Sequence, residues 1–438
     1  MSTSHEDTQA RLPDNTIPAA SSCESRRAGL LLSLQRKIWD FPCKKKLGTS
    51  STGLLILTCV FILLFHHLGI VRRGNIIMPS PSSDKDLRMA AAIQGNLNAS
   101  TRGLNSQCKM KTNLAFLKVH KAGSHTTACI LQRFGYEHGL NFVLPKKCGS
   151  ANLGFPEGLT KDRLMKQDVD EYNMLIHHTV YDRVKFHQLM APDTQYVAIL
   201  REPLSHLKSA FFYFNIDSKL GLSAKENPLG LYLDNPWQYV TKRPRGLMTM
   251  NLQSFVLGWK DRFNVTDDDR EEGRKFISQL DNDFSLVLIL EYFDASLVLL
   301  RRLMCWTFYN ILYDRQPRNK QTYYKPASVY TEHQLKNHRN LSWVDYQLYQ
   351  HFNTSLWSKI QAAGPDFQDE LEAFQQLNDD VNSYCAGRPT EKKTFPASKW
   401  NEAVEIKPEF CRDLKNTRKK WDKKICQRVH EHGEDKMI

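Results

Sequence analysis

The sequence predicts an α/β protein, with a central parallel sheet flanked by helices, preceded by one membrane-spanning helix. Short apolar runs alternate with longer amphipathic stretches from residue 113 onward, and this alternation is typical of parallel strands joined by crossover helices. Residues 53–71 carry no formal charge and suffice to cross a bilayer core of roughly 30 Å. The chain has 438 residues and 41% hydrophobic content, enough to bury one large core or two modest ones.

The residues around the apolar run predict its orientation. Lysines and arginines gather within residues 36–46, whereas only Arg72 and Arg73 follow at once, so the positive-inside bias places the amino terminus in the cytosol. About fifty mostly polar residues precede the run, which argues against a cleaved signal peptide. A buried core helix is the alternative, and the Ser-, Asn- and Pro-rich stretch that follows disfavours it. We therefore expect a single-pass type II protein.

A lumenal location predicts modifications of the part that follows the span. Such a compartment permits disulfides and N-linked glycans. Seven cysteines follow the span, and their scattered spacing predicts no particular disulfide pairing. Because their number is odd, at least one thiol stays outside a disulfide. Their spacing does not match that of zinc ligands. The formal net charge of +13 suits polyanionic ligands, and a lumenal address argues against nucleic acid. The glycosylation candidates are Asn98, Asn264, Asn340 and Asn353.

These features divide the chain into five segments. We expect a cytosolic tail (1–52), the membrane anchor (53–71), a lumenal stem (72–111), an α/β domain (112–380) and a basic C-terminal extension (381–438). Residues 216–282 are rich in Pro, Gly and charge, which indicates loops and short helices. Strands are expected at 114–117, 173–178, 196–200 and 285–290, and helices at 126–138, 203–215, 294–308 and 343–362.

The turn after the first strand has the composition of an anion site. In a doubly wound sheet, ligands bind beyond the carboxyl ends of strands, where a helix amino terminus supplies free amides. Gly123 lets the backbone approach a ligand, Lys121 supplies a mobile cation, and Ser124, Thr126 and Thr127 supply hydroxyls. The lysine precedes the glycine, so this is not a Walker A loop and magnesium is not implied. An ordinary solvated turn is the alternative.

A second stretch strengthens the anion interpretation. The apolar run 196–200 ends in Arg201, and Pro203 opens a helix that carries Ser209. An arginine at a strand end and a serine two turns into the next helix can converge on one phosphate. A surface arginine and serine at an ordinary helix start are the alternative.

Together the two stretches resemble a known family. Lys-x-His-Lys-x-x-Ser-x-Thr at 118–126 and Arg-x-Pro at 201–203, with Ser209 eight residues after the arginine, resemble the 5′-phosphosulfate loop and the 3′-phosphate site of sulfotransferases that use 3′-phosphoadenosine 5′-phosphosulfate (PAPS). Residues 116–121, 133–135, 176–178, 286–300, 305–306 and 348–353 are similar to the galactose-3-O-sulfotransferase family, over roughly residues 112–365. The resemblance implies a P-loop-NTPase-like PAPS-dependent sulfotransferase fold, with PAPS as donor and no metal.

The resemblance also implies roles for individual residues. Lys121 is the expected catalytic lysine, which steadies the phosphosulfate and the charge on the leaving phosphate. Arg201 and Ser209 are the expected ligands of the 3′-phosphate. The donor-binding loop is expected to comprise Lys118, Lys121, Ala122, Gly123, Ser124, His125, Thr126 and Thr127.

The acceptor hydroxyl needs a base. His178 is the preferred candidate because it ends the strand 173–178, where related carbohydrate sulfotransferases place a catalytic histidine. His177 should face the opposite side, although the two assignments can exchange. We expect acceptor contacts from His120, His177 and Glu291, a helix-capping role for Asp294, and packing roles for Trp306, Trp343 and Trp357.

The loop departs from the family pattern at several positions. Val119, Ala122 and His125 stand where hydroxyl-bearing residues are expected, Glu202 replaces an aspartate, and the stretch 178–181 lacks the usual arginine. These changes affect acceptor specificity more than donor binding, because Lys121 and Arg201 remain.

We therefore expect a Golgi enzyme that transfers a sulfuryl group from PAPS to the 3-hydroxyl of a terminal β-galactose on a glycolipid or glycoprotein glycan. Two alternatives stay open: a sulfotransferase for another sugar or a glycosaminoglycan, and a noncatalytic glycan-binding protein with a decayed nucleotide site. A lumenal kinase is disfavoured by the lysine spacing.

Overall fold

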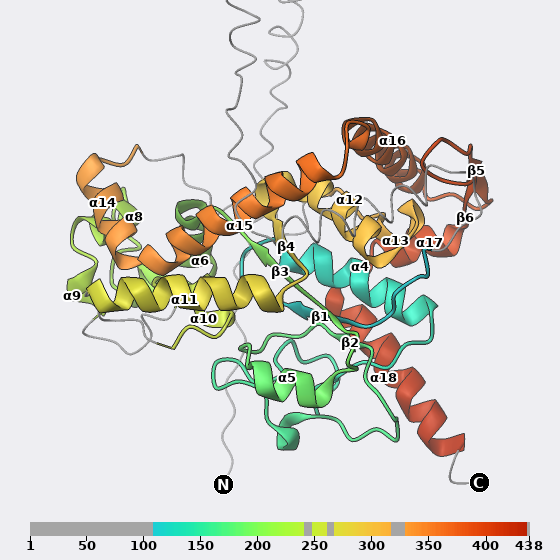
Figure 1. Ribbon diagram of the computed structural model, residues 1–438, viewed down its shortest axis with the longest axis horizontal. Coiled ribbons are helices and arrows are strands. Elements are labelled where there is room, and N and C mark those ends of the chain that lie inside the picture. Colours follow the sequence, from blue (N-terminus) through green and yellow to red (C-terminus); the bar gives the residue numbers. More distant parts are fainter. Residues whose placement is uncertain (1–107, 241–247, 261–266, 317–328, 436–438) are drawn as a thin grey trace, which may run out of the picture. The chain divides into compact units, whose positions relative to one another are not determined.

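The structure is a computed structural model that describes residues 108–240, 248–260, 267–316 and 329–435 (Figure 1). These residues belong to one compact unit within Pro79–Ile438. The expected membrane anchor at 53–71 and the sequons at Asn98 and Asn264 lie outside the described residues. Within the described ranges, every helix is too short or too polar to cross a bilayer.

A parallel four-stranded sheet forms the centre of the described unit. The strands are β1 (Leu114–Leu117), β2 (Met174–Leu175), β3 (Gln195–Leu200) and β4 (Leu286–Ile289), in the order β2-β1-β3-β4. All strand residues except Gln195 are buried, because helices and loops cover both faces. The expected α/β architecture with a central parallel sheet is confirmed.

The strand order creates a switch point at the middle of the sheet. The chain passes from β1 to β2 on one side and then crosses to β3 on the other side of β1. In open α/β sheets, ligands bind beyond the carboxyl ends of strands at such a point. The loop that begins at Lys118 follows β1, and Arg201 follows β3, so both leave the sheet at this edge.

The second strand is shorter than expected. Only Met174 and Leu175 pair with β1, whereas 173–178 was the expected strand. The backbone of His178 pairs instead with the loop at Ala151–Leu153: its N–H donates to the Ala151 carbonyl (2.9 Å), and its carbonyl accepts from the Leu153 amide (2.7 Å). This second pairing keeps residues 176–178 extended beyond the sheet.

The crossover helices follow the predicted pattern closely. α4 (Ser124–Glu137) follows β1, α6 (Pro203–Tyr213) follows β3 and α12 (Phe293–Met304) follows β4. α15 (Trp343–Ala362) has the predicted bounds. The shorter elements are η1 (Lys161–Arg163), α5 (Arg183–Leu189), α7 (Ile216–Lys219), α8 (Pro228–Asp234), α9 (Trp237–Val240), α10 (Leu252–Val256), η3 (Leu290–Tyr292), α13 (Phe308–Ile311) and α14 (Glu332–Leu341).

Two long helices differ from the sequence-based expectation. Residues 216–282 include α11 (Asp267–Asp283), a 17-residue helix in a region expected to hold loops and short helices. Ile277 and Leu280 are buried and lie three residues apart, so a narrow apolar stripe suffices to dock this polar helix. α16 (Phe367–Ala386) runs without interruption through the position of the expected boundary at 380/381.

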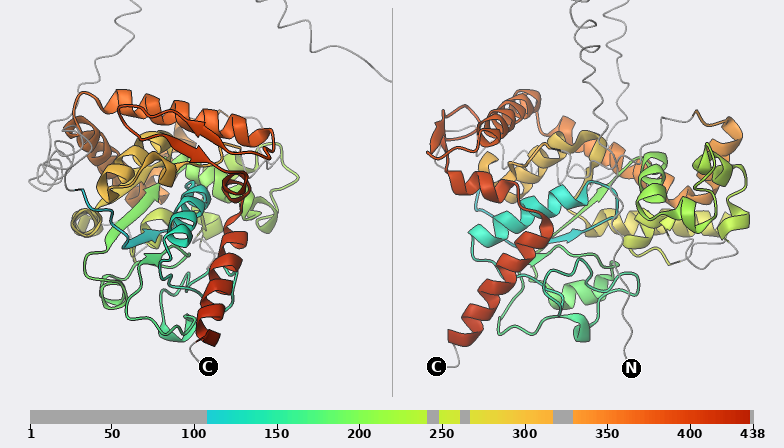
Figure 2. Two further views of the ribbon diagram at one scale, coloured as in Figure 1. Left: turned by 90° about the vertical axis from the view of Figure 1, so that its right-hand side faces the viewer. Right: turned by 180° about the vertical axis from the view of Figure 1, so that it is seen from behind.

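The C-terminal part folds back onto the α/β unit. It comprises the hairpin β5 (Lys393–Phe395) and β6 (Val404–Ile406), then α17 (Pro408–Leu414) and α18 (Arg418–Asp435). α18 packs against α4, and both views of Figure 2 show the start of the red helix next to the cyan one. Disulfides join Cys108 to Cys305, Cys148 to Cys426 and Cys385 to Cys411, while the buried Cys129 forms none.

Candidate active site

The loop between β1 and α4 turns sharply because two of its residues are left-handed. Lys121 has φ 60° and Gly123 has φ 75°. A Cβ atom on Gly123 would lie 2.5 Å from Cδ1 of Leu290, so this position demands glycine both for its conformation and for its space. The amides of Thr126 and Thr127 donate to the Gly123 carbonyl (3.1 and 3.4 Å), so α4 begins directly at the loop. Its amino terminus therefore faces the strand ends, where it can bind an anion.

Arg201 reaches this loop from the neighbouring strand. Its Nη1 donates to the carbonyl oxygen of Lys121 (3.2 Å). Gln253 holds the backbone of Arg201 through both ends of its amide: Oε1 accepts from the Arg201 amide (2.9 Å) and Nε2 donates to the Arg201 carbonyl (2.8 Å). The two cations expected to hold one nucleotide therefore lie together at the switch point of the sheet.

Helix α6 is bound to the same loop. His206 donates from Nε2 to the His120 carbonyl (2.7 Å), and Glu202 caps the helix by accepting from the amides of Leu204 (2.9 Å) and Ser205 (2.7 Å). The glutamate that replaces the family aspartate is thus a helix cap. Ser209 lies two turns along α6 and is half-buried. It is therefore held on the helix that contacts the Lys121 loop.

The charge state of Lys121 reflects these surroundings. Burial, and then the nearby Arg201 guanidinium, lower the pKa of Lys121 to about 8, and no carboxylate of the described residues is among the influences on it. Its ammonium lies 3.6 Å from the ring centroid of Tyr213, on α6. Two neighbouring cations that pair with no carboxylate of the described residues favour a bound anion, which would raise the pKa of Lys121 again.

His178 lies beside the loop in the state that a base requires. Its Nδ1 is 2.8 Å from the Lys118 carbonyl, and because a carbonyl only accepts, Nδ1 carries the hydrogen and Nε2 keeps its lone pair. The ring stacks on His120, with centroids 3.8 Å apart and planes within 9°. Burial, then Lys118 and His120, hold the pKa of His178 well below its usual range. The imidazole is therefore neutral near pH 7.

His177 has a different environment. Its side chain is 1% exposed, and Nε2 donates to Oδ1 of Asp422 on α18 (3.1 Å). Burial, with Lys118 and Arg418 nearby, lowers the pKa of His177, so its ring is neutral as well. The structure thus places His177 in the core, which does not fit the expected acceptor contact. His178 and His120, by contrast, are half-buried at this edge.

Several residues expected to bind the donor instead shape the loop. The Ser124 hydroxyl is buried and donates to the Val119 carbonyl (2.6 Å), and that of Thr127 donates to the Gly123 carbonyl (3.5 Å). Lys118 is 3% exposed, and burial with the neighbouring Arg418 lowers its pKa to about 7. Ala122 is buried too, whereas His125 and Thr126 are half-buried.

The two acidic candidates after β4 have separate partners. Glu291 is exposed at the strand end; it accepts from the Glu202 amide (3.0 Å) and from the Tyr349 hydroxyl (3.2 Å). The sequence predicts that Asp294 caps α12. The structure differs, because the N-cap of α12 is Tyr292. The Asp294 carboxylate accepts instead from Tyr313 (2.6 Å) and Gln375 (3.0 Å) and pairs with Arg315 (3.3 Å).

The other sequence-predicted positions are distributed over the surface and core. Asn340 is exposed in the last turn of α14, and Asn353 is half-buried within α15. Trp306 and Trp343 are buried, as packing residues should be, and Trp357 is half-buried. No group of three or more His, Cys, Asp or Glu within the described ranges is arranged to hold a metal ion.

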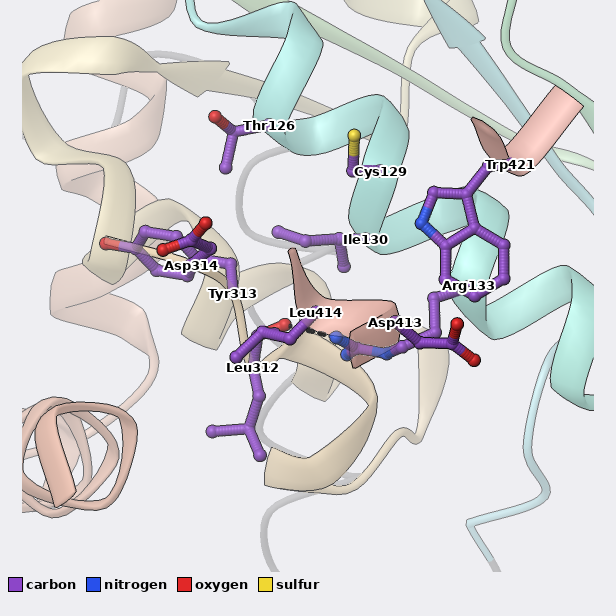
Figure 3. A pocket seen from close by; sticks show the side chains of 10 residues that line it. All are labelled: Thr126, Cys129, Ile130, Arg133, Leu312, Tyr313, Asp314, Asp413, Leu414 and Trp421. Atoms are coloured by element: carbon purple, nitrogen blue, oxygen red, sulfur yellow. Dashed lines mark hydrogen bonds between the residues drawn. The ribbon is translucent and has the colours of Figure 1, made fainter. Parts of the chain in front are cut away.

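A small pocket lies beside α4, and neither Lys121 nor Arg201 is among the residues that line it. It is enclosed by α4, the segment after α13, and the C-terminal α17 and α18 (Figure 3). Arg133 lines it and donates from Nη1 to the Leu312 carbonyl (2.8 Å). Thr126 is the one expected donor ligand among its lining residues, so the pocket does not define the candidate active site.

Comparison with known proteins identifies the family. The family model described as Galactose-3-O-sulfotransferase matches residues 29–408. The chain belongs to this family. It is therefore a sulfotransferase, which requires a sulfate donor. The resemblance inferred from the motifs is confirmed.

Individual members of the galactose-3-O-sulfotransferase family match over much of their length. Human galactosylceramide sulfotransferase is 28% identical over 81% of this chain and 82% of its own. Mouse galactose-3-O-sulfotransferase 2 is 30% identical over 64% of this chain and 71% of its own. Mouse galactose-3-O-sulfotransferase 3 is 33% identical over 57% of this chain and 58% of its own.

Sequence reasoning missed three residues that shape this sulfotransferase site. Tyr213 follows Ser209 by four residues on α6, a helical spacing that already places both on one face. Gln253 and Asp422 had no such signal, because each meets its partner from a distant part of the chain: Gln253 is 52 residues from Arg201 and Asp422 is 245 from His177.

Proposed function

We propose that this sulfotransferase moves a sulfuryl group from PAPS to the 3-hydroxyl of a terminal β-galactose, carried by a galactosylceramide-like glycolipid or by a glycoprotein glycan. The observation that carries the proposal is the contact of Arg201 with the Lys121 loop at the switch point of the sheet. Family membership and the names of the relatives support the galactose acceptor.

The donor has two charged ends that suit the two cations. In this proposal Lys121 and the amino terminus of α4 bind the 5′-phosphosulfate, and Arg201 with Ser209 binds the 3′-phosphate. The close approach permitted by Gly123 and the depressed pKa of Lys121 both fit an anion at this place. Ser124 and Thr127 support the loop through their hydroxyls.

The reaction is an in-line displacement at sulfur. The acceptor oxygen forms a bond to sulfur while the bond from sulfur to the bridging phosphate oxygen breaks, and adenosine 3′,5′-bisphosphate leaves. Lys121 stabilises the charge that develops on the leaving phosphate, and His178 Nε2 takes the hydroxyl proton. Positioning and charge stabilisation account for most of the rate, as in phosphoryl transfer. A positioned base adds about 10² to 10⁴.

We also propose a Golgi location, with the catalytic domain lumenal and the chain anchored as a single-pass type II membrane protein. The uncharged run 53–71 and its cationic flank support the anchor. The three disulfides support an oxidising compartment. The proposed role lies in glycolipid or sphingolipid metabolism, with no nucleic-acid partner.

An acceptor screen tests the proposal. The full-length protein in detergent is incubated with radiolabelled PAPS and galactosylceramide, lactosylceramide, galactose-terminated N- and O-glycans, or a polyuronide. We expect label on O3 of galactose. Label on the polyuronide alone would favour the glycosaminoglycan alternative, and donor binding without transfer to any acceptor would favour the noncatalytic one.

A further inference from the structure

We propose that the C-terminal helix α18 is part of the catalytic apparatus, and that its Asp422 is a positioning residue for the base His178. The inference rests on the proposed function, because it acts through His178. α18 begins at Arg418, beyond residue 408 where the family match ends. Two sets of contacts, which share Arg418, connect this helix to His177 and His178.

The first set centres on the buried Asp422 carboxylate, which is 1% exposed. It accepts hydrogen bonds from Nε2 of His177 (3.1 Å), from the Gln132 amide of α4, and from the Arg418 guanidinium one turn earlier on α18. Gln132 and His177 are themselves 0% and 1% exposed. A buried carboxylate is tolerated when it is paired and fully hydrogen-bonded, and here its bonds join α18 to α4 and to the segment that follows β2.

The second set holds the loop that pairs with His178. Arg418 donates to the carbonyls of Gly149 (3.1 Å) and Ser150 (3.2 Å), and the disulfide between Cys148 and Cys426 joins the start of this loop to α18. The next residues, Ala151–Leu153, are those that bond to the His178 backbone (2.9 and 2.7 Å). α18 therefore fixes His177 by its side chain and His178 by its backbone partner.

Arg201 and the Lys121 loop are braced by residues outside α18, and Gln132, which bonds α4 to α18, lies two turns beyond the amino terminus of α4. Arg201 is braced by Gln253 and the Lys121 loop is bonded to His206, and both of these partners lie on helices that follow β3. A displacement of about 1 Å at a catalytic group can lower the rate about 10²-fold. Loosening α18 should therefore lower kcat and leave donor binding intact.

The test compares Asp422→Ala and Asp422→Asn with Lys423→Ala, an exposed position on the same helix. We expect Asp422→Ala to lower kcat about 10- to 100-fold, with a donor KM and a Kd for adenosine 3′,5′-bisphosphate within about 3-fold of wild type. Asp422→Asn, which keeps an acceptor oxygen for His177 and Gln132, should recover part of kcat, and Lys423→Ala should match wild type. An unchanged kcat, or a parallel loss of kcat and donor affinity, would overturn the inference.

A double-mutant comparison asks whether Asp422 acts through His178. In a His178→Ala background, Asp422→Asn should lower the residual kcat less than about 2-fold. In a Lys121→Ala background, it should lower kcat by the same factor as in the wild-type protein. If Asp422→Asn slowed the reaction by its full factor in both backgrounds, this inference would be overturned and the proposed function would stand. Absence of sulfuryl transfer by the wild-type protein would overturn the proposed function and this inference with it.

Discussion

Arg201 and Lys121 are in direct contact: the guanidinium Nη1 of Arg201 lies 3.2 Å from the carbonyl oxygen of Lys121. The contact crosses from the tip of β3 to the loop after β1, where the strand order reverses. It fixes the backbone of Lys121 at a positive φ of 60°. Two cations are thereby held at the place where an open α/β sheet binds its ligand.

Replacing Gly123 should weaken donor binding. Gly123→Ala adds a Cβ that meets Leu290 at 2.5 Å and places alanine at φ 75°, a strain of about 1–2 kcal/mol before any clash. That strain lowers the free energy of unfolding, whereas relief of the clash displaces the loop and removes contacts with the ligand. We expect about a 10-fold weaker affinity for adenosine 3′,5′-bisphosphate by calorimetry, which corresponds to a loss of about 1.4 kcal/mol of binding free energy.

Gly139→Ala is the matched control for that substitution. Gly139 has φ 68° with nothing within 4 Å of its virtual Cβ, so the change carries the conformational strain without the clash and away from the loop. It should lower the free energy of unfolding by about 1–2 kcal/mol and leave donor affinity unchanged. Normal donor affinity in Gly123→Ala would refute the role given to the loop.

Donor capture should weaken at alkaline pH. Lys121 has its pKa lowered to about 8 by burial and Arg201, so it is a cation below that pH and loses its charge above it. We therefore expect kcat/KM for PAPS to fall above about pH 8, as read from a pH profile of the free enzyme. Lys121→Arg, which stays charged, should abolish this alkaline limb even though its geometry lowers the rate. A profile that stays flat to pH 9.5 would contradict the assignment.

The fold should lose stability in acid. Burial lowers the pKa of His206 to about 4 and those of His177 and His338 to about 3, whereas each titrates near 6.5 in the unfolded chain. Between these values the unfolded state binds more protons, so the free energy of unfolding falls as pH drops from about 6.5 to 4.

Urea denaturation at a series of pH values measures this effect. Each histidine that is charged only when unfolded contributes a slope of up to about 1.4 kcal/mol per pH unit. His206→Gln should flatten the slope by one such contribution. A free energy of unfolding independent of pH between 6.5 and 4 would show that these histidines are protonated in the folded state.

The two described sequons should differ in occupancy. Asn340 is exposed at the end of α14, whereas Asn353 is half-buried within α15 and its Oδ1 is buried. Given the proposed lumenal location, we expect mass spectrometry to find a glycan on Asn340 and none on Asn353. Asn340→Gln should shift the electrophoretic mobility and Asn353→Gln should not; the reverse pattern would contradict the packing of α15.

The core of the fold was predictable because its signals are local. The apolar runs at 114–117 and 286–289 are short and apolar throughout, which is typical of strands buried on both faces, and parallel strands bring their carboxyl ends to one edge. The meeting of Lys121 with Arg201 follows from that rule. The resemblance of the two motifs to those of sulfotransferases then predicted PAPS as the donor.

The features of the fold and site that the sequence did not predict depend on contacts between residues far apart in the chain. β2 ends early because His178 pairs with the loop at 151–153, and Asp294 gives up its expected cap to bind Tyr313 and Arg315. His177 is withdrawn into the core by Asp422, 245 residues away. None of these partners shares a periodicity or motif with the residue it binds, so sequence patterns could not reveal them.

Nucleotide binding by the Arg201→Ala variant tests the central claim most directly. Calorimetry would compare adenosine 3′,5′-bisphosphate with adenosine 5′-monophosphate, which lacks the 3′-phosphate, in wild type, Arg201→Ala and Lys121→Ala. Loss of a hydrogen-bonded charge contact of about 1.5–3 kcal/mol predicts that Arg201→Ala weakens the bisphosphate about 10- to 150-fold and the monophosphate hardly at all, while Lys121→Ala weakens both. Equal weakening of the two nucleotides by Arg201→Ala, or no weakening of either, would contradict the account.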